Sequence, residues 1–166
     1  MAKMPPIRQT YDQETAKARF DLYRGAHEQL KRAVENGFYI EAVAICESML
    51  SDRLQARYGF LNGDDENSRR ERTLSHLITL LIKEDQAEDC QKLQEIYTAI
   101  DRWRLLRNKA IHNVVKLNVG DQKQTFGERY SGLEEAASTG KALVSKLNDE
   151  LKRQKRRNLR HQAEAG

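Results

Sequence analysis

Hydrophobic residues recur at intervals of three and four along most of this chain, which is the spacing of one face of an α-helix. No stretch of comparable length alternates between apolar and polar residues as a half-buried strand would. The pattern therefore predicts five helices, at about residues 13–36, 38–58, 73–83, 89–115, and from about residue 127 into the residues after 151.

Each predicted helix has a stripe of residues that we expect to face the core. The second helix also has a wholly apolar run at 42–46, so we expect it at the centre of the bundle, with residues 38–40 adding apolar surface at its start. The expected inward residues are Ala16, Phe20, Tyr23, His27, Leu30 and Val34; Val43, Cys46, Met49, Leu50 and Leu54; Leu74, Leu77, Ile78 and Leu81; Leu93, Ile96, Ile100 and Trp103; and Phe126, Tyr130, Leu133, Ala137, Gly140, Val144, Leu147 and Leu151.

Helix-breaking and turn-forming residues separate the predicted helices. Pro5-Pro6 disfavours a helix at the start of the chain, and Asn36-Gly37 supplies a C-terminal stop. The segment 58–72 is rich in glycine, asparagine and charge, which predicts a surface loop. The sequence thus predicts an all-α, single-domain helical bundle, with a flexible N-terminal arm at 1–12, the bundle at 13–151 and a basic C-terminal tail at 152–166.

Composition narrows the class of protein further. The 166 residues are 33% charged and 7% aromatic, with nine glycines and two prolines, which favours helices over an all-β fold. No apolar run approaches the roughly 18 residues of a membrane span, and Met1 to Thr10 lacks the apolar core of a secretory signal. Cys46 and Cys90 fall in predicted helices, and free thiols suit them better than a single disulfide. We therefore expect a cytoplasmic protein that does not bind a membrane.

Positive charge is concentrated near the end of the chain, although the net charge is only +4. The segment from residue 152 to residue 160 contains no acidic residue and includes Lys152, Arg153, Arg156 and Arg157. Such a run can attract phosphate groups or keep a helix end hydrated. Because no aromatic residue lies within it, the run carries no signal for base recognition. A nucleic-acid contact and a solvated helix end both remain open.

The segment from Arg102 to Asn113, at the end of the fourth predicted helix, is the main candidate for chemistry. It places Arg107, Asn108 and His112 at the margin of the core. A histidine can take a proton from a ribose 2′-hydroxyl or return one to the leaving oxygen, and an arginine can hold a phosphate in a bidentate fork. The chain has no His-Glu-x-x-His and no Cys-x-x-Cys pattern, so we expect no metal and no cofactor.

Helix geometry sets a condition on this candidate site. At about 100° per residue, Asn108 and His112 share one face of a helix, whereas Arg107 and His112 lie about 140° apart. They converge if the Arg107 side chain wraps around the helix, if the helix ends near His112, or if a second subunit completes the site. Spacing alone is also compatible with an ordinary surface helix end.

The sequence Arg107-Asn108-Lys109-Ala110-Ile111-His112 resembles the signature of the HEPN superfamily (higher eukaryote and prokaryote nucleotide-binding domains). That signature is an arginine, four to six residues of which the first is polar, and a histidine. The resemblance implies a helical bundle that acts as a metal-independent endoribonuclease and leaves a 2′,3′-cyclic phosphate, with two motifs facing one cleft of a homodimer. Arg107 and His112 would be catalytic, and Asn108 would support them.

The resemblance also implies an acidic or polar residue from an earlier helix in the same cleft. Glu47 is the best match, with Ser51 and Asp52 as alternatives. Some HEPN toxins pair with a minimal nucleotidyltransferase and carry a tyrosine two residues after the histidine, where this chain has Val114. The resemblance therefore does not imply that particular antitoxin mechanism for this protein. We expect RNA as the substrate and a role as a toxin or antiphage effector, with an antitoxin or other regulatory protein as a further partner.

Other histidines, aromatic residues and cations that could belong to a functional site also have ordinary structural explanations. We expect His27 at the edge of the core and His76 exposed, while His161 belongs to the basic tail. Tyr97 and Trp103 fit a core or a dimer interface better than a base-stacking platform. Three cations around the motif, Arg102, Arg104 and Lys109, can widen a positive surface or simply be solvated. The rival function is a non-catalytic HEPN-like dimer that binds nucleotide, RNA or a partner protein, and a third is a basic-tail adaptor on nucleic acid.

Overall fold

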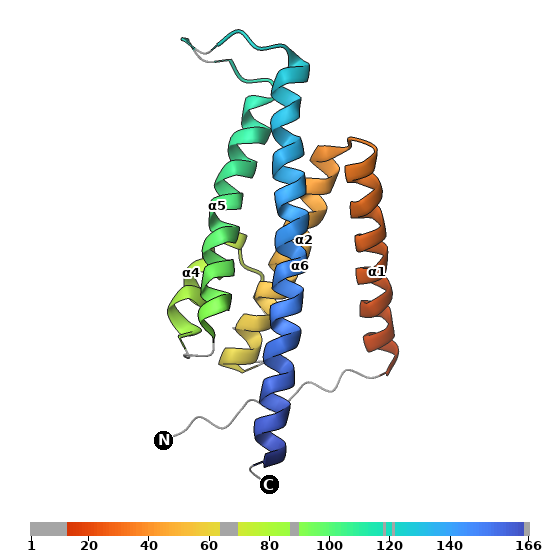
Figure 1. Ribbon diagram of the computed structural model, residues 1–166, viewed down its shortest axis with the longest axis vertical. Helices are drawn as coiled ribbons and strands as arrows, with labels where there is room; N and C mark the ends of the chain where they lie inside the picture. Colours follow the sequence, from red (N-terminus) through yellow and green to blue (C-terminus); the bar gives the residue numbers. More distant parts are fainter. Residues whose placement is uncertain (1–12, 64–69, 87–89, 118, 121, 165–166) are drawn as a thin grey trace.

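The structure is a computed structural model that describes residues 13–63, 70–86, 90–117, 119–120 and 122–164. These residues form an all-α, single-domain bundle of five helices, which confirms the predicted fold class (Figure 1). The predicted arm at 1–12, residues 64–69 of the predicted loop and residues 165–166 of the tail lie outside the described residues. The helices are α1 (Gln13–Glu35), α2 (Tyr39–Asn62), α4 (Leu74–Glu84), α5 (Gln91–Asn113) and α6 (Phe126–Glu164).

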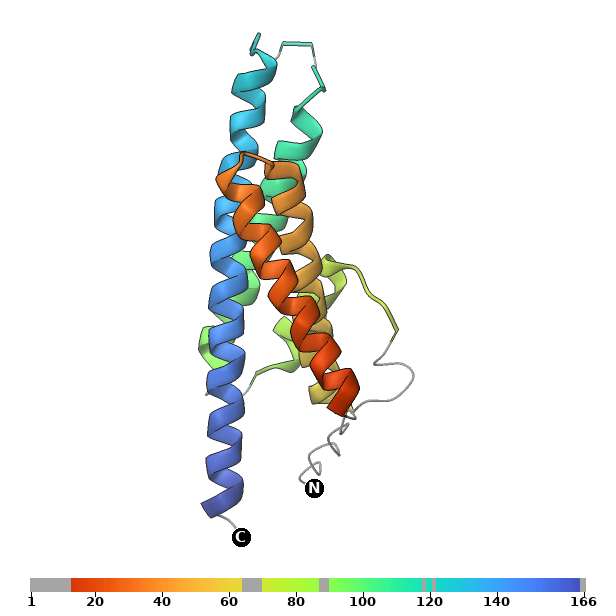
Figure 2. The ribbon, with the colours of Figure 1, turned by 90° about the vertical axis from the view of Figure 1, so that its right-hand side faces the viewer.

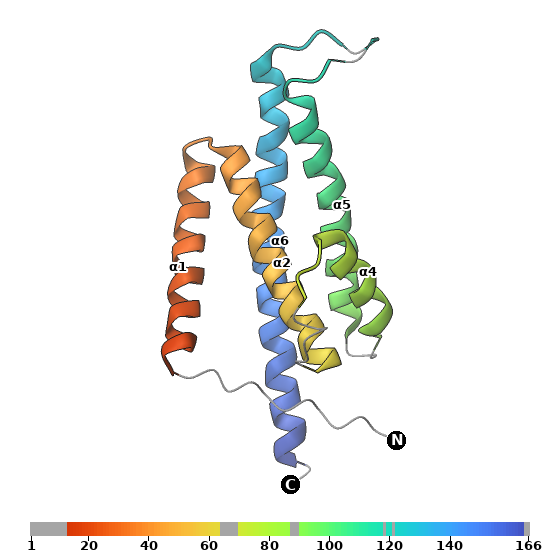
Figure 3. The same cartoon turned by 180° about the vertical axis from the view of Figure 1, so that it is seen from behind.

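Helices α2 and α6 form the centre of the bundle. α2 packs against α1, α4 and α6, and α6 also packs along the length of α5. Seen from behind, α2 separates α1 from the α4–α5 side (Figure 3). The central place of α2 confirms the expectation from its apolar run, and its predicted inward residues are all buried: Val43, Cys46, Met49, Leu50 and Leu54.

A tryptophan fixes α5 against α6. Trp103 is 1% exposed, and its Nε1–H donates to the backbone oxygen of Ala136 at 2.7 Å. The ring lies directly over Gly140, where an added Cβ would come within 2.9 Å of the ring atom Cζ2. Only glycine allows the two helices this close, so the predicted inward place of Gly140 has a steric reason.

A buried ion pair joins α2 to the end of α4. The Arg57 guanidinium donates to both carboxylate oxygens of Asp85, at 2.6 and 2.9 Å, and the Tyr97 hydroxyl donates to the same carboxylate at 2.7 Å. Burial alone would raise the pKa of Asp85, but the hydrogen bond and charge of Arg57, with the hydrogen bond from Tyr97, lower it below its ordinary value. Gln94 donates to the Asp85 backbone oxygen and anchors α5 at the same place.

The expected inward stripe of α1 is wrong at Phe20 and His27, while Tyr23 is partly buried against the core as expected. Phe20 is 65% exposed and His27 is also exposed, whereas Leu30 and Ala33 are buried. α1 crosses the bundle at an angle and moves away from α6 toward its N-terminal end, so only its second half packs closely (Figure 2). The apolar residues of α1 have the spacing of a helix face, but the angle between α1 and its neighbouring helices determines how many of these residues are buried.

Three further expectations about helix ends need correction. Phe38 and Ile40 are about half exposed and do not thicken the core. α2 continues through Gly59 to Asn62, so the loop begins later than predicted. Phe126 is 61% exposed, although its ring stacks on Tyr130 at 5.7 Å. In each case apolar surface at the end of a helix extends past the neighbours that would cover it.

Within the described part of the chain, no helix combines the length and apolar character needed to cross a membrane. Cys46 and Cys90 are both buried, and the described residues contain no disulfide. Burial raises the pKa of the Cys46 thiol to about 12, so this residue packs as a small apolar side chain.

Gly140→Ala is expected to lower the free energy of unfolding by about 1–3 kcal/mol, because the new methyl group would overlap the buried Trp103 ring. Gly132→Ala on the same helix is the matched control. A Cβ there meets nothing within 4 Å, so alanine should stabilise the helix by up to about 1 kcal/mol. Urea unfolding followed by the fluorescence of Trp103, the only tryptophan, measures both. Equal effects of the two substitutions would contradict the close packing.

Asp85→Asn is expected to lower the free energy of unfolding by about 3–5 kcal/mol at pH 7, because it leaves the buried Arg57 charge without its partner. The native pKa of Asp85 is depressed, so its contribution is complete above the unfolded value of about 3.9 and is lost as the pH falls through the lower native value. The free energy of unfolding should be measured with urea between pH 7 and pH 3. In the parent protein the contribution of Asp85 should disappear below about pH 4, whereas Asp85→Asn has no such contribution to lose. Asp21→Asn, which removes an exposed pair with Arg24, should cost less than about 1 kcal/mol.

Candidate functional site

The motif arginine is held by an acid from an earlier helix. The Arg107 Nη2 donates to Glu47 Oε1 at 2.6 Å, which joins α5 to α2. The Arg107 side chain is 15% exposed and that of Glu47 is 36% exposed, so the pair lies at the edge of the core. The predicted neighbour of the motif, Glu47, is thus in direct contact with it.

The rest of the Arg107 guanidinium has few partners. Its Cζ lies 5.9 Å from the centre of the Trp103 ring, one helical turn earlier on α5. Its Nε is buried and has no hydrogen-bond acceptor among the described residues. A buried donor without an acceptor is uncommon in proteins and costs stability. The guanidinium is therefore fixed in place by Glu47 while part of its hydrogen-bonding capacity is unused.

His112 lies in the last turn of α5, which ends one residue later at Asn113. Its side chain is exposed, and Asn108, one turn earlier on the same face, is half-buried. One of the three geometric conditions is met, because the helix ends next to the histidine. No hydrogen bond joins Arg107 to His112 among the described residues, and helical rotation places the two residues about 140° apart on α5.

Arg129 of α6 holds the end of α5 in place, a role that no sequence pattern indicated. Its Nη1 donates to the backbone oxygen of Asn113 at 2.7 Å and also to that of Lys116. These contacts satisfy carbonyls that the end of a helix leaves without partners. Since the contact spans 16 positions along the chain, no local pattern could have predicted it. Arg129 fixes the backbone directly after His112.

The two alternatives to Glu47 have different surroundings. Ser51 is half-buried, one turn further along α2. Asp52 points toward α1, where it accepts from Arg19 at 3.3 Å and from the Tyr23 hydroxyl. Asp52 therefore serves the α1–α2 contact and not the surroundings of Arg107.

The predicted cations are only partly available to a ligand. Arg104 is paired with Asp101 at 2.9 Å, and Arg153 donates to both oxygens of Glu150. Four others are exposed, two beside the motif and two in the basic segment of α6: Arg102, Lys109, Lys152 and Arg156. Arg157 is half-buried. Positive side chains therefore occur both near the motif and near the end of α6.

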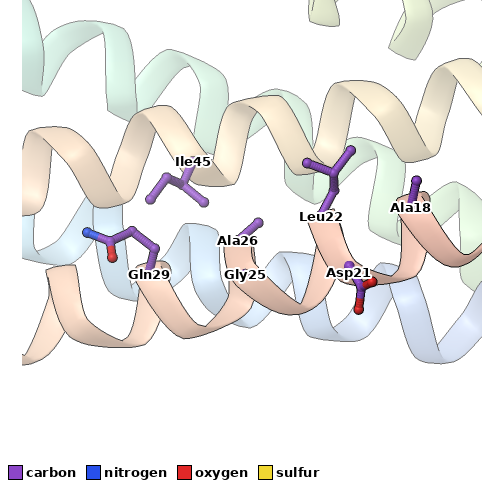
Figure 4. A pocket seen from close by; sticks show the side chains of 7 residues that line it. All are labelled: Ala18, Asp21, Leu22, Gly25, Ala26, Gln29 and Ile45. Carbon is purple, nitrogen blue, oxygen red and sulfur yellow. The ribbon is translucent and has the colours of Figure 1, made fainter.

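A separate hollow lies between α1 and α2, away from this site. Its exposed surface is mostly apolar, and Leu22 of α1 and Ile45 of α2 both extend into the space between the two helices (Figure 4). The only charged side chain in its lining is Asp21, which pairs with Arg24. The hollow therefore lacks the groups for acid–base or phosphate chemistry, and Arg107 and Glu47 remain the better candidate.

The side chains of the described residues contain no group of three or more histidines, cysteines or carboxylates placed to hold a metal ion. Comparison with known proteins finds no matching family model, no similar curated protein and no similar solved structure. The chemistry of the site therefore has to be inferred from its own residues.

Glu47→Ala is expected to lower the free energy of unfolding by about 1–3 kcal/mol, because it leaves the largely buried Arg107 guanidinium without an acceptor. Asp52→Ala is the matched control, since it removes an acid of the same helix whose arginine partner is more exposed, and it should cost less than about 1 kcal/mol. Urea unfolding of the single variants and of Glu47→Ala/Arg107→Ala gives the coupling energy. A coupling energy of zero would mean that the pair is not formed in solution.

Proposed function

We propose that this protein is a metal-independent endoribonuclease of the HEPN type that works as a homodimer. Arg107 stabilises the charge that develops on the reacting phosphate, His112 carries out proton transfer, and Asn108 supports them. The observation that carries the proposal is the Glu47–Arg107 contact, because an acid from an earlier helix beside the motif arginine is what the HEPN resemblance implied. A toxin or antiphage role, with a protein that controls it, fits an enzyme that cuts cellular or viral RNA.

The environment of Arg107 supports a role in binding phosphate. Glu47 fixes the guanidinium through Nη2 only, so its remaining N–H groups are available to phosphate oxygens, and a small movement would bring the unpaired Nε into use. A preorganised arginine stabilises negative charge without first having to be ordered. Glu47 thus acts as a positioning residue for Arg107.

The exposure of His112 supports proton transfer with RNA. The imidazole takes the proton of a ribose 2′-hydroxyl, and the 2′-oxygen attacks the adjacent phosphorus. The bond from phosphorus to the 5′-oxygen then breaks, and that oxygen receives a proton. The products are a 2′,3′-cyclic phosphate and a 5′-hydroxyl end, and no step requires a metal ion.

The angle between Arg107 and His112 supports the homodimer. The two residues lie about 140° apart on a helix that continues to Asn113, so one chain cannot direct both at the same phosphate without bending its long side chain. A second copy can supply the missing group, and it also provides a second histidine to protonate the leaving oxygen. The rival, a dimer that binds RNA or a partner protein without cutting it, would use the same residues only as ligands.

We expect purified protein to cleave RNA in the presence of EDTA. His112→Ala should lower kcat/KM by about 10²–10⁴-fold, and Arg107→Ala by about 10²–10³-fold. The assay is release of fluorescence from a labelled oligoribonucleotide, with product ends identified by mass spectrometry. A single 2′-deoxy substitution at the cleaved position should block cutting there.

His76→Ala and Arg32→Ala are the controls, because they remove an exposed histidine and an exposed arginine that lie outside the candidate site. Both should retain parental activity. Binding of RNA with no cleavage by the parent protein would support the non-catalytic rival. Cleavage that survives in both His112→Ala and Arg107→Ala would show that these residues are not the active site.

A further inference from the structure

Helix α6 extends beyond the rest of the bundle. It runs without a break from Phe126 to Glu164, and its last turns project past the ends of α2, α4 and α5 (Figures 1 and 3). Gln154 is the last buried residue of α6. The predicted basic tail is therefore, as far as residue 164, an ordered helix that stands largely in solvent.

The cations on this projecting segment are available to a ligand. Lys155, Arg156 and Arg160 are exposed, and neither they nor Arg157 form an ion pair with any described residue. Successive residues are rotated by about 100°, so Lys155, Arg156 and Arg157 together cover more than half of the circumference of the helix. A phosphate chain can contact several of them from one side, whereas Arg153 is engaged by Glu150.

Positive charge continues from this segment onto the bundle. Burial lowers the pKa of His27 on α1, and the charges of Arg53 on α2 and Lys152 on α6 lower it further. Lys152 is exposed and lies just before the projecting segment. The positive surface therefore begins where α1, α2 and α6 meet and continues along α6 as far as Arg160.

This surface is far from the candidate active site. Arg129 contacts the backbone beside His112, so His112 lies level with the first turns of α6. At 1.5 Å per residue, the part of α6 from Arg129 to Lys152 is about 35 Å long. An A-form RNA duplex rises less per base pair than the roughly 3.4 Å of B-DNA, so this length corresponds to more than about ten base pairs of RNA.

We propose that the projecting end of α6, formed by Lys152, Lys155, Arg156 and Arg160, is a docking site for the phosphate backbone of RNA, about 35 Å away from the position that is cut. The proposal rests on the proposed function for the nature of the ligand, and it adds that the substrate is a long or base-paired RNA. No aromatic side chain lies between Lys152 and Arg160, so docking depends on charge and not on base sequence.

The test uses Lys155→Gln/Arg156→Gln/Arg160→Gln in a His112→Ala background, so that binding is measured without cutting. By fluorescence anisotropy, this variant should bind a 24-base-pair RNA at least about tenfold more weakly than His112→Ala alone. The slope of log affinity against log salt should fall by about two to three, one for each lost phosphate contact. Lys17→Gln/Arg32→Gln/Lys83→Gln removes the same number of charges from exposed positions elsewhere and should leave affinity nearly unchanged.

The active protein provides a second readout. With His112 intact, the α6 variant should lose at least about tenfold in kcat/KM on the long RNA and retain parental kcat/KM on a five-nucleotide RNA that is too short to reach α6. Equal binding by the two triple variants would overturn the docking site. So would preferential binding of the α6 segment to vesicles with 30% anionic lipid over RNA. If nothing is cut, the proposed function fails, while the binding measurements still decide whether α6 docks RNA.

Discussion

The packing of Trp103 on Gly140 is the contact on which the rest of the arrangement depends. It brings α5 and α6 close enough for the indole N–H to donate to the Ala136 backbone oxygen. Because it fixes the position of α5 along the axis of α6, it also determines which residues of α6 lie beside each later residue of α5. One turn beyond it, Arg107 lies at the edge of the core, where Glu47 of α2 can reach it. About three turns beyond it, the end of α5 lies where Arg129 can hold it.

Two arginine–carboxylate pairs in this bundle differ in what surrounds them. Arg57 and Asp85 are almost fully buried, and the carboxylate is further bound by Tyr97, so each charged group has several partners. Arg107 and Glu47 are joined by one hydrogen bond, and Arg107 keeps a buried donor without an acceptor. A pair that only stabilised the fold would be expected to resemble the first. The proposed phosphate contact would give this Arg107 N–H the acceptor that it lacks.

The sequence was sufficient for the helices because their buried stripes depend on local spacing. The inward residues of α2, α4 and α5 are buried as predicted, and so are most of those of α6. The prediction that Phe20 and His27 face the core was wrong, since the angle at which α1 crosses its neighbours is a property of the whole bundle and not of local spacing. At the site, the motif and Glu47 could be proposed from their residue types. The Glu47–Arg107 contact and the role of Arg129 could not, because they join positions far apart in the chain.

The continuity of α6 constrains how the two ends of the molecule can act together. A single helix joins the end of α5 to the basic segment, so their separation is fixed by helix geometry and not by a flexible linker. A ligand that touches both must itself span that distance, and a stiff duplex does so with less loss of conformational freedom than a flexible strand. When such an RNA is bound at the basic segment of α6, its effective concentration at the site near His112 is higher. The same helix that supports the motif can in this way select the length of its substrate.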